Sequence, residues 1–588
     1  MQSIELLMLN VHRPYCNNVS KFGGFSGIYL ISAFVEENGF EAKAFAGTLH
    51  EGKKIVDEYC QGKSVSVIGL YCDYENVTEN RFLCSYIKRK YGIPVLVGGP
   101  QATALKLEFY LETLCDVVVL GEGELTMLEL LRHFVSGNIK LSEIKGIRYF
   151  DPDSNELRTT GARPLIKNLD ALPFISRHNS LDDTFRRTQA SIMTGRGCPF
   201  HCAFCYEGHH TVKVRFRSVE NVLAEVDEFL AELDGHFGYI MFTDDTFTLD
   251  SERVRKLCEG LAERKKKYDF QWFCEGHVHT LFLHPEMLEY MANAGLKRLQ
   301  LGIEAGTQNV LDYYRKGCTL DEMRFVISKC VELDIEQIFG NIIVGGPHFN
   351  LSVFEQDLAF GKELLYLAKG RMELGVVSFW PLPETELTEH ADKYGIQIED
   401  NEFLTTSSDF SGVHTADIDI WGITALVNKM NREFRDYMKE LLINDKIPLR
   451  LVSKWYAENG KCISTGQWFY ELTLMKHHYN YYGLLCQFDC KRFFDLDKGK
   501  IFEYHPMRVG PLYNFCEKKD DILNVYGETL DKLSMSVIKY SAGKMNVGEI
   551  ISRLKQEFSS KDEEKFEEKV VDIYSDLAIK HMVVFSEY

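Results

Sequence analysis

Two features that would place a protein at a membrane or on nucleic acid are missing from this 588-residue sequence. No stretch reaches the roughly 18 consecutive apolar residues of a membrane-spanning helix. Basic residues are in the minority, because 67 Lys and Arg stand against 86 Asp and Glu and give a formal net charge of −19. A chain this acidic is a poor general binder of phosphate backbones. We therefore expect neither a membrane nor a nucleic-acid partner.

We also expect no secretory leader. The first segment, MQSIELLMLNVHRPY, has only a short apolar run, an acidic Glu5 and no basic start. We therefore expect a cytoplasmic protein, a compartment in which disulfides are rare. The 16 cysteines should then be buried thiols, metal ligands or catalytic groups.

Apolar, strand-like runs alternate with helical patterns over residues 1–135. Near-continuous apolar strands joined by helices indicate a doubly wound parallel sheet. Ligands of such sheets lie beyond the carboxyl ends of the strands. Glycines in these loops let a ligand approach the backbone, although they are equally expected in tight turns. The candidate binding residues at these strand ends are Gly98, Gly99, Pro100, Gln101, Gly121 and Glu122.

A second βα alternation with different spacing runs from about residue 188 to residue 383. Six strand patterns alternate with helices, and Ser218 is expected to cap the first of these helices. Six successive βα units predict an open or partial (β/α)6 barrel of the TIM type. Chemistry in such barrels belongs at the carboxyl ends of the strands.

The whole pattern predicts an α/β protein made of several parts. These parts are a Rossmann-like domain at 1–135, a connector with a small hairpin at 136–185, the partial barrel at 186–395, a mostly helical region at 396–508 and a winged-helix-like module at 509–588. In the last module, Asn546 and Glu549 stand at capping-box spacing before an apolar helical face.

Three cysteines stand within eight residues in the stretch GRGCPFHCAFCYEG, at positions 198, 202 and 205. Structural zinc sites usually add a fourth protein ligand from a second Cys or His pair. His201 lies inside the stretch, and Cys486 and Cys490 are far downstream. Three thiolates on a four-iron cluster would leave one iron open to a small molecule. From the spacing alone, both an iron–sulfur cluster and a zinc site remain possible.

The Cys198-x3-Cys202-x2-Cys205 pattern, with Phe204 before the last cysteine, resembles the signature of radical S-adenosylmethionine (SAM) enzymes. The segments FTDDTF, LGIEAG, Lys316-Gly317 and IIVGGP follow in the order seen in that family. The resemblance implies that the three cysteines hold a 4Fe–4S cluster and that SAM chelates its open iron. It also implies that Phe204 lies beside the adenine, that Asp244 and Asp245 contact SAM, and that Glu304 does so near the ribose and carboxylate.

These carboxylates also have ordinary interpretations. Asp244 and Asp245 could be a solvated strand end. Glu304, in contrast, stands among apolar residues on a buried strand, where a carboxylate without a partner is costly.

The stretches VLVGGPQATA and DVVVLGEGELTMLELL resemble the cobalamin-binding domain that precedes many radical SAM barrels. The sequence lacks the Asp-x-His-x-x-Gly motif of other cobalamin proteins, and Gln101 stands where a histidine is often found. The resemblance implies cobalamin as a third cofactor, although a sheet that has lost its cofactor is an alternative. Together the two parts imply C-methylation of an unactivated carbon.

The segment KYSAGKMNVGEIISRLKQEF and the helix after it resemble the recognition element that binds precursor peptides as an added strand. This implies a ribosomally made precursor (leader) peptide as substrate, methylated and possibly closed to a ring such as a cyclopropane. A flavodoxin or ferredoxin is the implied electron donor. The alternatives are a small-metabolite substrate, a purely structural C-terminal module, and a metal-stabilised regulatory protein without enzymatic activity.

Overall fold

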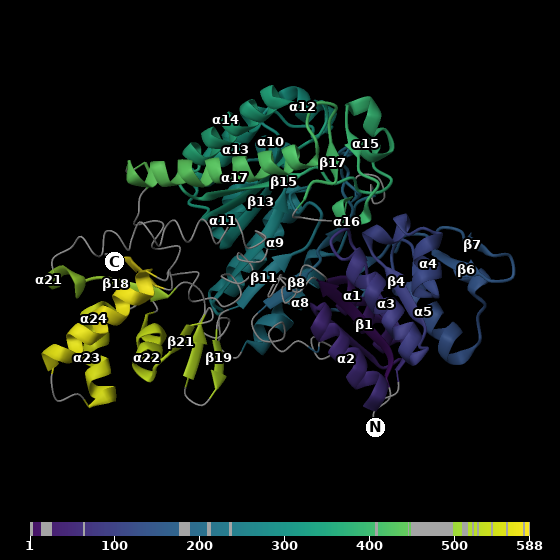
Figure 1. Cartoon of the computed structure of the whole chain (residues 1–588), viewed down its shortest axis with the longest axis horizontal. Coiled ribbons are helices and arrows are strands. Elements are labelled where there is room, and N and C mark those ends of the chain that lie inside the picture. Colours follow the sequence, from purple (N-terminus) through teal and green to yellow (C-terminus); the bar gives the residue numbers. More distant parts are fainter. Residues whose placement is uncertain are drawn as a thin grey trace. The chain divides into compact units, whose positions relative to one another are not determined.

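The computed structural model describes residues 4–12, 26–62, 65–175, 181, 189–207, 213–233, 238–405, 410–444, 446–447, 498–508, 516–519, 522–525, 528–541, 545–559, 563–579 and 583–586. Cys486, Cys490 and the rest of residues 448–497, in the region predicted to be helical at 396–508, lie outside these residues. The chain divides into two compact units, residues 1–364 with 373–430 and residues 365–372 with 431–588 (Figure 1).

The first unit begins with a seven-stranded sheet. Its strands are β1 (Ile4–His12), β2 (Ala42–Thr48), β3 (Val65–Tyr71), β4 (Val95–Gly98), β5 (Val117–Val119), β6 (Ile147–Asp151) and β7 (Glu156–Thr159), in the order β2-β1-β3-β4-β5-β6-β7. The strands from β2 to β5 are parallel. This order reverses direction between β1 and β3, which makes the carboxyl ends of these two strands the topological switch point.

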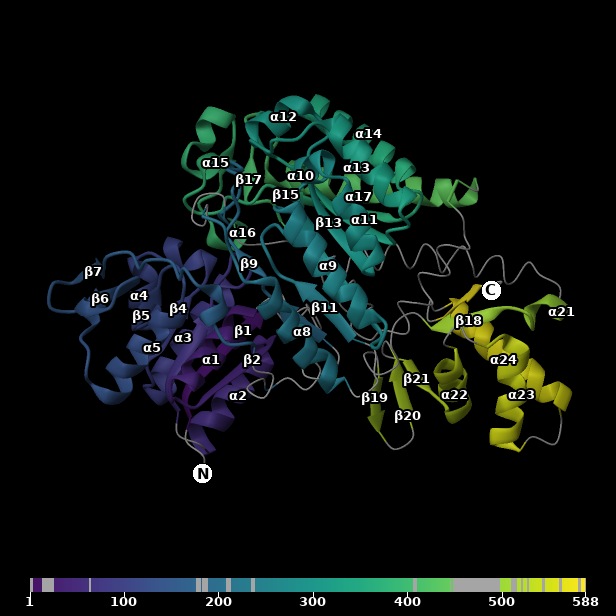
Figure 2. The same cartoon turned by 180° about the vertical axis from the view of Figure 1, so that it is seen from behind.

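Helices cover both faces of this sheet (Figure 2). Helices α1 (Ser26–Glu37) and α5 (Glu124–Leu131) pack in one apolar core with Leu6 and Met8 of β1. Helices α2 (Leu49–Gly62), α3 (Val77–Tyr91) and α4 (Leu107–Thr113) pack in a second core with Leu7 and Leu9 of the same strand. Because successive side chains of a strand point to opposite faces, an apolar run of this kind serves both cores. The doubly wound sheet is as predicted.

The sequence analysis missed two elements of this sheet and misplaced a boundary. It did not identify β2 and α2, where small alanines and a charged helix weaken the apolar signal. The hairpin expected in the connector is present as β6 and β7, but it pairs antiparallel with β5 and so extends the N-terminal sheet to Thr159. A short 3₁₀ helix, η2 (Pro100–Ala104), follows β4.

The six predicted barrel strands are all present. They are β8 (Gln189–Ile192), β11 (Gly238–Phe242), β12 (Phe270–Gly276), β13 (Leu296–Glu304), β14 (Gln337–Val344) and β15 (Met372–Ser378), in the order β15-β14-β13-β12-β11-β8. The pairs from β8 to β14 are parallel. In the described part of the chain β8 and β15 each have one neighbour in this sheet, so the barrel is open.

Helices follow each of the first five barrel strands in turn. They are α8 (Val219–Glu232), α9 (Ser251–Lys265), α10 (Val278–Leu283), α11 (Glu286–Asn293), α12 (Gln308–Tyr313), α13 (Leu320–Glu332) and α14 (Leu351–Leu367). The side chain of Ser218 accepts a hydrogen bond from the backbone N–H of Asn221, so Ser218 caps α8 as predicted. A long helix, α17 (Ile420–Ile443), comes after the barrel.

The second unit has its own apolar core. Helices α22 (Lys532–Tyr540), α23 (Val547–Phe558) and α24 (Glu563–Ile579) pack with an antiparallel pair, β18 (His505–Arg508) and β22 (Val583–Ser586). A meander of β19 (Cys516–Lys519), β20 (Ile522–Val525) and β21 (Glu528–Leu530) precedes them. The capping box of Asn546 and Glu549 is confirmed. The winged-helix assignment stays a prediction.

Among the helices that the structure describes, none has a stretch both long and apolar enough to cross a bilayer.

Candidate functional site

The cysteine loop follows the first barrel strand, at the carboxyl edge of the sheet. It begins after a two-residue strand, β9 (Gly195–Arg196), which pairs antiparallel with β10 (Arg215–Phe216). Cys202 is buried, whereas Cys198 and Cys205 are half-buried. The backbone N–H of Cys205 donates to the carbonyl of Cys202 at 3.1 Å, which closes a turn between these two thiols.

The three thiols of this loop are the candidate ligands for a metal group. In the part of the chain that the structure describes, no three His, Cys, Asp or Glu side chains converge closely enough to hold one metal ion. Thiolates are the usual protein ligands of iron–sulfur clusters, and each would bind its own iron of a four-iron cluster. Burial raises the pKa of Cys202, and the Lys316 cation opposes this rise. The donor set therefore fits an iron–sulfur cluster.

Two aspartates after β11 hold the start of this loop. Asp244 is buried, and its carboxylate accepts hydrogen bonds from the backbone N–H of Thr194 at 2.6 Å and from the Thr194 hydroxyl. Burial raises the pKa of Asp244 to about 6. Asp245 is exposed and accepts a hydrogen bond from the Gly197 N–H at 2.9 Å. Asp244 is therefore not a solvated strand end. Contact of either aspartate with SAM stays a prediction.

Glu304 stands at the end of β13, in a left-handed backbone conformation with φ 62°. Its buried carboxylate pairs with Lys316 at 2.9 Å. Burial alone would lower the pKa of Lys316, but the Glu304 carboxylate outweighs this and raises it. Gly302 makes room for the pair, because a Cβ there would lie 2.0 Å from the Lys316 Nζ. Lys316 is therefore the partner that a buried glutamate requires.

Asp357 of α14 holds the loop that follows Glu304, a contact that the sequence analysis did not identify. Its Oδ1 accepts a hydrogen bond from the Gly306 N–H at 2.6 Å, and its side chain is only 1% exposed. Burial raises the pKa of Asp357 to about 7. Asp357 is 51 residues from Gly306 in sequence, and no local motif links them.

Aromatic side chains of the cysteine loop rest on the barrel. The Phe204 ring meets Tyr314 edge-on, with centroids 4.9 Å apart, and the Lys316 Nζ lies 5.9 Å from the Phe204 ring centre. Phe204 therefore lies near the pair formed by Glu304 and Lys316. Phe200 stacks on His277, with centroids 3.6 Å apart and planes 10° apart. His277 was not among the predicted site residues.

The predicted cobalamin-binding residues lie at the strand ends of the N-terminal sheet. Gly99 has φ 120°, and a Cβ there would lie 2.4 Å from the carbonyl oxygen of Cys72, so only glycine fits. The Gln101 N–H donates to the same carbonyl at 3.2 Å. Gly98 ends β4, Pro100 begins η2, and Gly121 has φ 76° in the loop after β5. These residues bring the backbone of β4 against the end of β3, beside the topological switch point.

Buried polar residues occupy the switch point itself. His12 ends β1, and burial lowers its pKa to about 4, so the imidazole is neutral. The Asn76 amide donates to the Asn10 side chain at 3.2 Å, and the Asp73 N–H donates to the Asn76 side chain at 2.9 Å. Polar groups thus replace the apolar core at this end of the sheet.

Glu122 joins the N-terminal sheet to the barrel. Its carboxylate pairs with Arg196 at 3.0 Å and with Arg215 at 2.8 Å, and it accepts a hydrogen bond from the Ile166 N–H at 2.7 Å. Glu124 also pairs with Arg196. Burial alone would raise the pKa of Glu122, but these partners lower it. Its contacts in the structure are therefore with protein, and contact with cobalamin stays a prediction.

The carboxyl ends of the strands in the N-terminal sheet also meet those of the barrel strands, through contacts of two tyrosines. Tyr74, three residues after β3, packs edge-on against Trp380, two residues after β15, with ring centroids 4.3 Å apart. Burial, with Cys205 and Glu275 among the neighbours, raises the pKa of Tyr74 well above its usual value. Burial also raises the pKa of Tyr206, next to Cys205, to about 12, against a hydrogen bond with Thr103 of η2. The cysteine loop therefore lies against the switch point of the first sheet.

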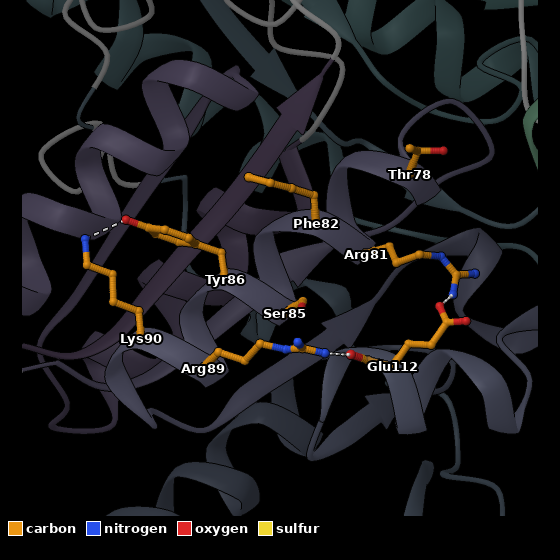
Figure 3. Close-up of a pocket in the computed structure, with 8 residues that line it drawn as sticks. All are labelled: Thr78, Arg81, Phe82, Ser85, Tyr86, Arg89, Lys90 and Glu112. Atoms are coloured by element: carbon orange, nitrogen blue, oxygen red, sulfur yellow. Dashed lines mark hydrogen bonds and ion pairs between the residues drawn. The ribbon is translucent and has the colours of Figure 1, made fainter.

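A separate surface pocket of about 630 Å³ lies between α3 and α4 (Figure 3). Arg81 and Arg89 both reach Glu112 there, while Lys90 reaches the Tyr86 hydroxyl at 2.7 Å. No predicted site residue lines it.

Comparison with known proteins agrees with this geometry. Residues 192–361 match the model of the radical SAM superfamily. An uncharacterised methyltransferase of Pyrococcus horikoshii is 29% identical over 327 residues, which are 54% of this chain. The chain spans 64% of that relative's length.

Two solved structures share the fold. The radical SAM methyltransferase TsrM of Kitasatospora setae, solved with tryptophan substrate and a SAM analogue, aligns with a TM-score of 0.57 and 17% identity, over 68% of this chain and 79% of its own. The cobalamin-dependent SAM radical enzyme OxsB, solved with aqua-cobalamin and SAM, aligns with a TM-score of 0.58 and 17% identity, over 98% of this chain and 84% of its own. The part of the chain that matches the radical SAM superfamily, residues 192–361, carries the three cysteines and the Glu304–Lys316 pair.

Proposed function

We propose that this protein is a cobalamin-dependent radical SAM enzyme that transfers a methyl group to an unactivated carbon. One observation carries the proposal: the cysteine loop lies against the strand ends of the N-terminal sheet, because Tyr206 hydrogen-bonds to Thr103 after β4 and Cys205 neighbours Tyr74 after β3. A cluster at the loop and a corrin at the switch point would thus share one reaction chamber. The names of the methyltransferase relatives support the reaction type.

The residues present fit these cofactors. Cys198, Cys202 and Cys205 would hold the 4Fe–4S cluster, and Glu304 with Lys316 would face SAM. A Cβ at Gly121, in the loop after β5, would meet no atom within 4 Å, so this strand end would have room for a ligand. When bound, the three cofactors supply a deoxyadenosyl radical and a transferable methyl group.

The chain's own side chains would hold this arrangement in place. Asp245 fixes the start of the cysteine loop through the Gly197 N–H, and Asp244 fixes the strand end before it. The Tyr74–Trp380 contact would help to close the space between the two sheets to water. Exclusion of water protects a radical from side reactions.

Anaerobic turnover tests the reaction. The reconstituted full-length enzyme, supplied with SAM, cobalamin and a reductant, should form 5′-deoxyadenosine and S-adenosylhomocysteine together. The product should gain the mass of one methylene group. Ring closure alone would instead remove two hydrogens. A product without added carbon would exclude methylation.

As the substrate class, we propose a ribosomally made precursor peptide. Its support is the second unit, in which β18 and β22 form a two-stranded antiparallel sheet over a helical core. In the described residues each of these strands has one partner, so each could pair with an added peptide strand. A small acidic electron carrier such as flavodoxin or ferredoxin would supply the reducing electron.

The full-length enzyme can test this substrate class. Turnover of a precursor peptide should exceed turnover of the same peptide without its leader, because the leader would raise the local concentration of the modified segment. Equal rates would exclude leader recognition. A small metabolite is the second candidate, and the tryptophan held by TsrM favours it. Methylation of free small molecules, with none of peptides, would decide for this candidate.

A further inference from the structure

His277 connects two parts of the site that are far apart in sequence. On one side its ring stacks on Phe200, which lies between Cys198 and Cys202, with centroids 3.6 Å apart. On the other side its Nε2 lies 3.0 Å from the backbone carbonyl of Lys316. The backbone N–H of His277 donates to the Thr248 hydroxyl at 3.0 Å. This bond fixes the backbone directly after β12, where His277 lies.

The hydrogen bonds define the state of the imidazole. A carbonyl only accepts, so Nε2 must carry the proton and donate it to Lys316. Burial, together with the Lys316 cation, lowers the pKa of His277 to about 3, so the ring is neutral. Nδ1 is then a bare acceptor, and it has no hydrogen-bond partner among the residues that the structure describes. The neutral ring therefore donates one hydrogen bond through Nε2 and keeps a flat face for stacking, so it can hold its two neighbours at a fixed separation.

The stacking geometry is also specific. The two rings lie within 10° of parallel at a distance typical of direct contact, and His277 is 5% exposed. Phe200 is half-buried and has no other ring contact in the described part of the chain.

We propose that His277 is a positioning residue for the iron–sulfur cluster and links it to the SAM-binding side of the site. Its ring fixes the cysteine loop through Phe200, and its N–H fixes the backbone of Lys316, whose side chain pairs with Glu304. One side chain therefore sets the distance between the cluster ligands and the Glu304–Lys316 pair. This inference rests on the cluster in the proposed function.

The experiment uses the full chain, reconstituted anaerobically with iron and sulfide. One readout is the rate at which a chelator removes iron. The other is the change that SAM causes in the electron paramagnetic resonance spectrum of the reduced cluster. In His277→Ala, which loses both contacts, iron should leave roughly tenfold faster, as for other residues that orient metal ligands.

Two further variants separate the contacts. His277→Phe keeps a ring against Phe200 but cannot donate to Lys316, so it should retain iron better than His277→Ala and show a weaker spectral response to SAM. Phe200→Leu removes the stack from the other side and leaves β12 intact, so it should lose iron faster with His277 present. His284→Phe, at an exposed position that is 53% accessible, is the matched control and should behave as wild type.

The outcomes distinguish this inference from the proposed function. Iron loss at the wild-type rate in both His277→Ala and Phe200→Leu would overturn the inference and leave the proposed function intact. If His277→Ala does not fold, Phe200→Leu and His277→Phe still decide it. A wild-type protein that binds no iron would instead overturn the proposed function.

Discussion

The Glu304–Lys316 pair illustrates how a buried charge in this site depends on its partner. We expect Lys316→Met to lower the free energy of unfolding by roughly 3–5 kcal/mol, because it leaves the Glu304 carboxylate buried and unpaired. The double variant Glu304→Gln/Lys316→Met should recover most of this loss, since it removes both charges. Chemical denaturation of the apo-protein measures both effects. Equal stability of the single and double variants would contradict the coupling.

Asp357 predicts a pH dependence of stability. Burial raises its pKa from 3.8 in the unfolded chain to about 7, so the folded state holds the proton more tightly. The contribution of Asp357 to the free energy of unfolding is therefore fully present below about pH 4. It is lost as the pH rises through 7. Asp357→Asn keeps an acceptor for the Gly306 N–H but cannot ionise, so its stability should not decline in this way.

At pH 8 we expect Asp357→Asn to exceed wild type by up to roughly 4 kcal/mol, and at pH 4 to equal it. Unfolding curves measured between these pH values test this. Asp417→Asn, at an exposed position, is the control and should follow wild type. Parallel pH profiles for wild type and Asp357→Asn would show that Asp357 stays ionised when buried.

At the residue scale, the sequence predicted candidate ligands of the cofactors. It did not predict the side chains that hold these ligands in place. The three cysteines and Glu304 stand in short motifs whose spacing is informative. Phe200 also lies within the cysteine motif, but its partner His277 belongs to a different βα unit. Such contacts arise from folding, and one sequence carries no local signal for them.

Arg196 joins two elements that belong to different sheets. It is 17% exposed and pairs with Glu122 and Glu124, which follow β5, while its own strand β9 leads into the cysteine loop. We expect Arg196→Met to lower the free energy of unfolding by about 3 kcal/mol, because it leaves one of these carboxylates buried with no cation. Arg215 still neutralises Glu122, which limits the loss.

Arg255 on α9 is a matched control for this variant, because it also pairs with two glutamates, Glu252 and Glu259. These partners are exposed, so Arg255→Met should lower the free energy of unfolding far less than Arg196→Met. Thermal unfolding of both variants checks the difference. Similar losses of stability in the two variants would mean that the pairing of Arg196 with Glu122 and Glu124 stabilises the fold no more than a surface ion pair does.

At the element scale, strands with long apolar runs were easy to predict and short or mixed ones were not. All six barrel strands were identified because each is a buried apolar run followed by a helical pattern. β2 was missed because its sequence, AKAFAGT, is made mostly of small residues. The pairing of β6 with β5 was also missed. An antiparallel strand can join a parallel sheet only at an edge strand that is still unpaired, and one sequence does not show which strand that is.

The division into two compact units predicts two unfolding transitions for the whole molecule. Asn546→Ala removes the cap of α23, which lies in the second unit, and should cost that unit about 1 kcal/mol. The transition of the first unit should not move, and neither should its iron content. Calorimetry resolves the two transitions. A common shift of both would show that the units unfold together.

The hairpin β6–β7 has a consequence for solubility. Without it, the sheet would end at β5, a Val-Val-Val strand whose backbone N–H and C=O groups would be open to pairing with another chain. The hairpin instead places Glu156 and Arg158 on the outermost strand, which is largely exposed. Charged side chains on a border strand oppose addition of further strands. The chain therefore carries its own protection against fibril-like self-association at this border.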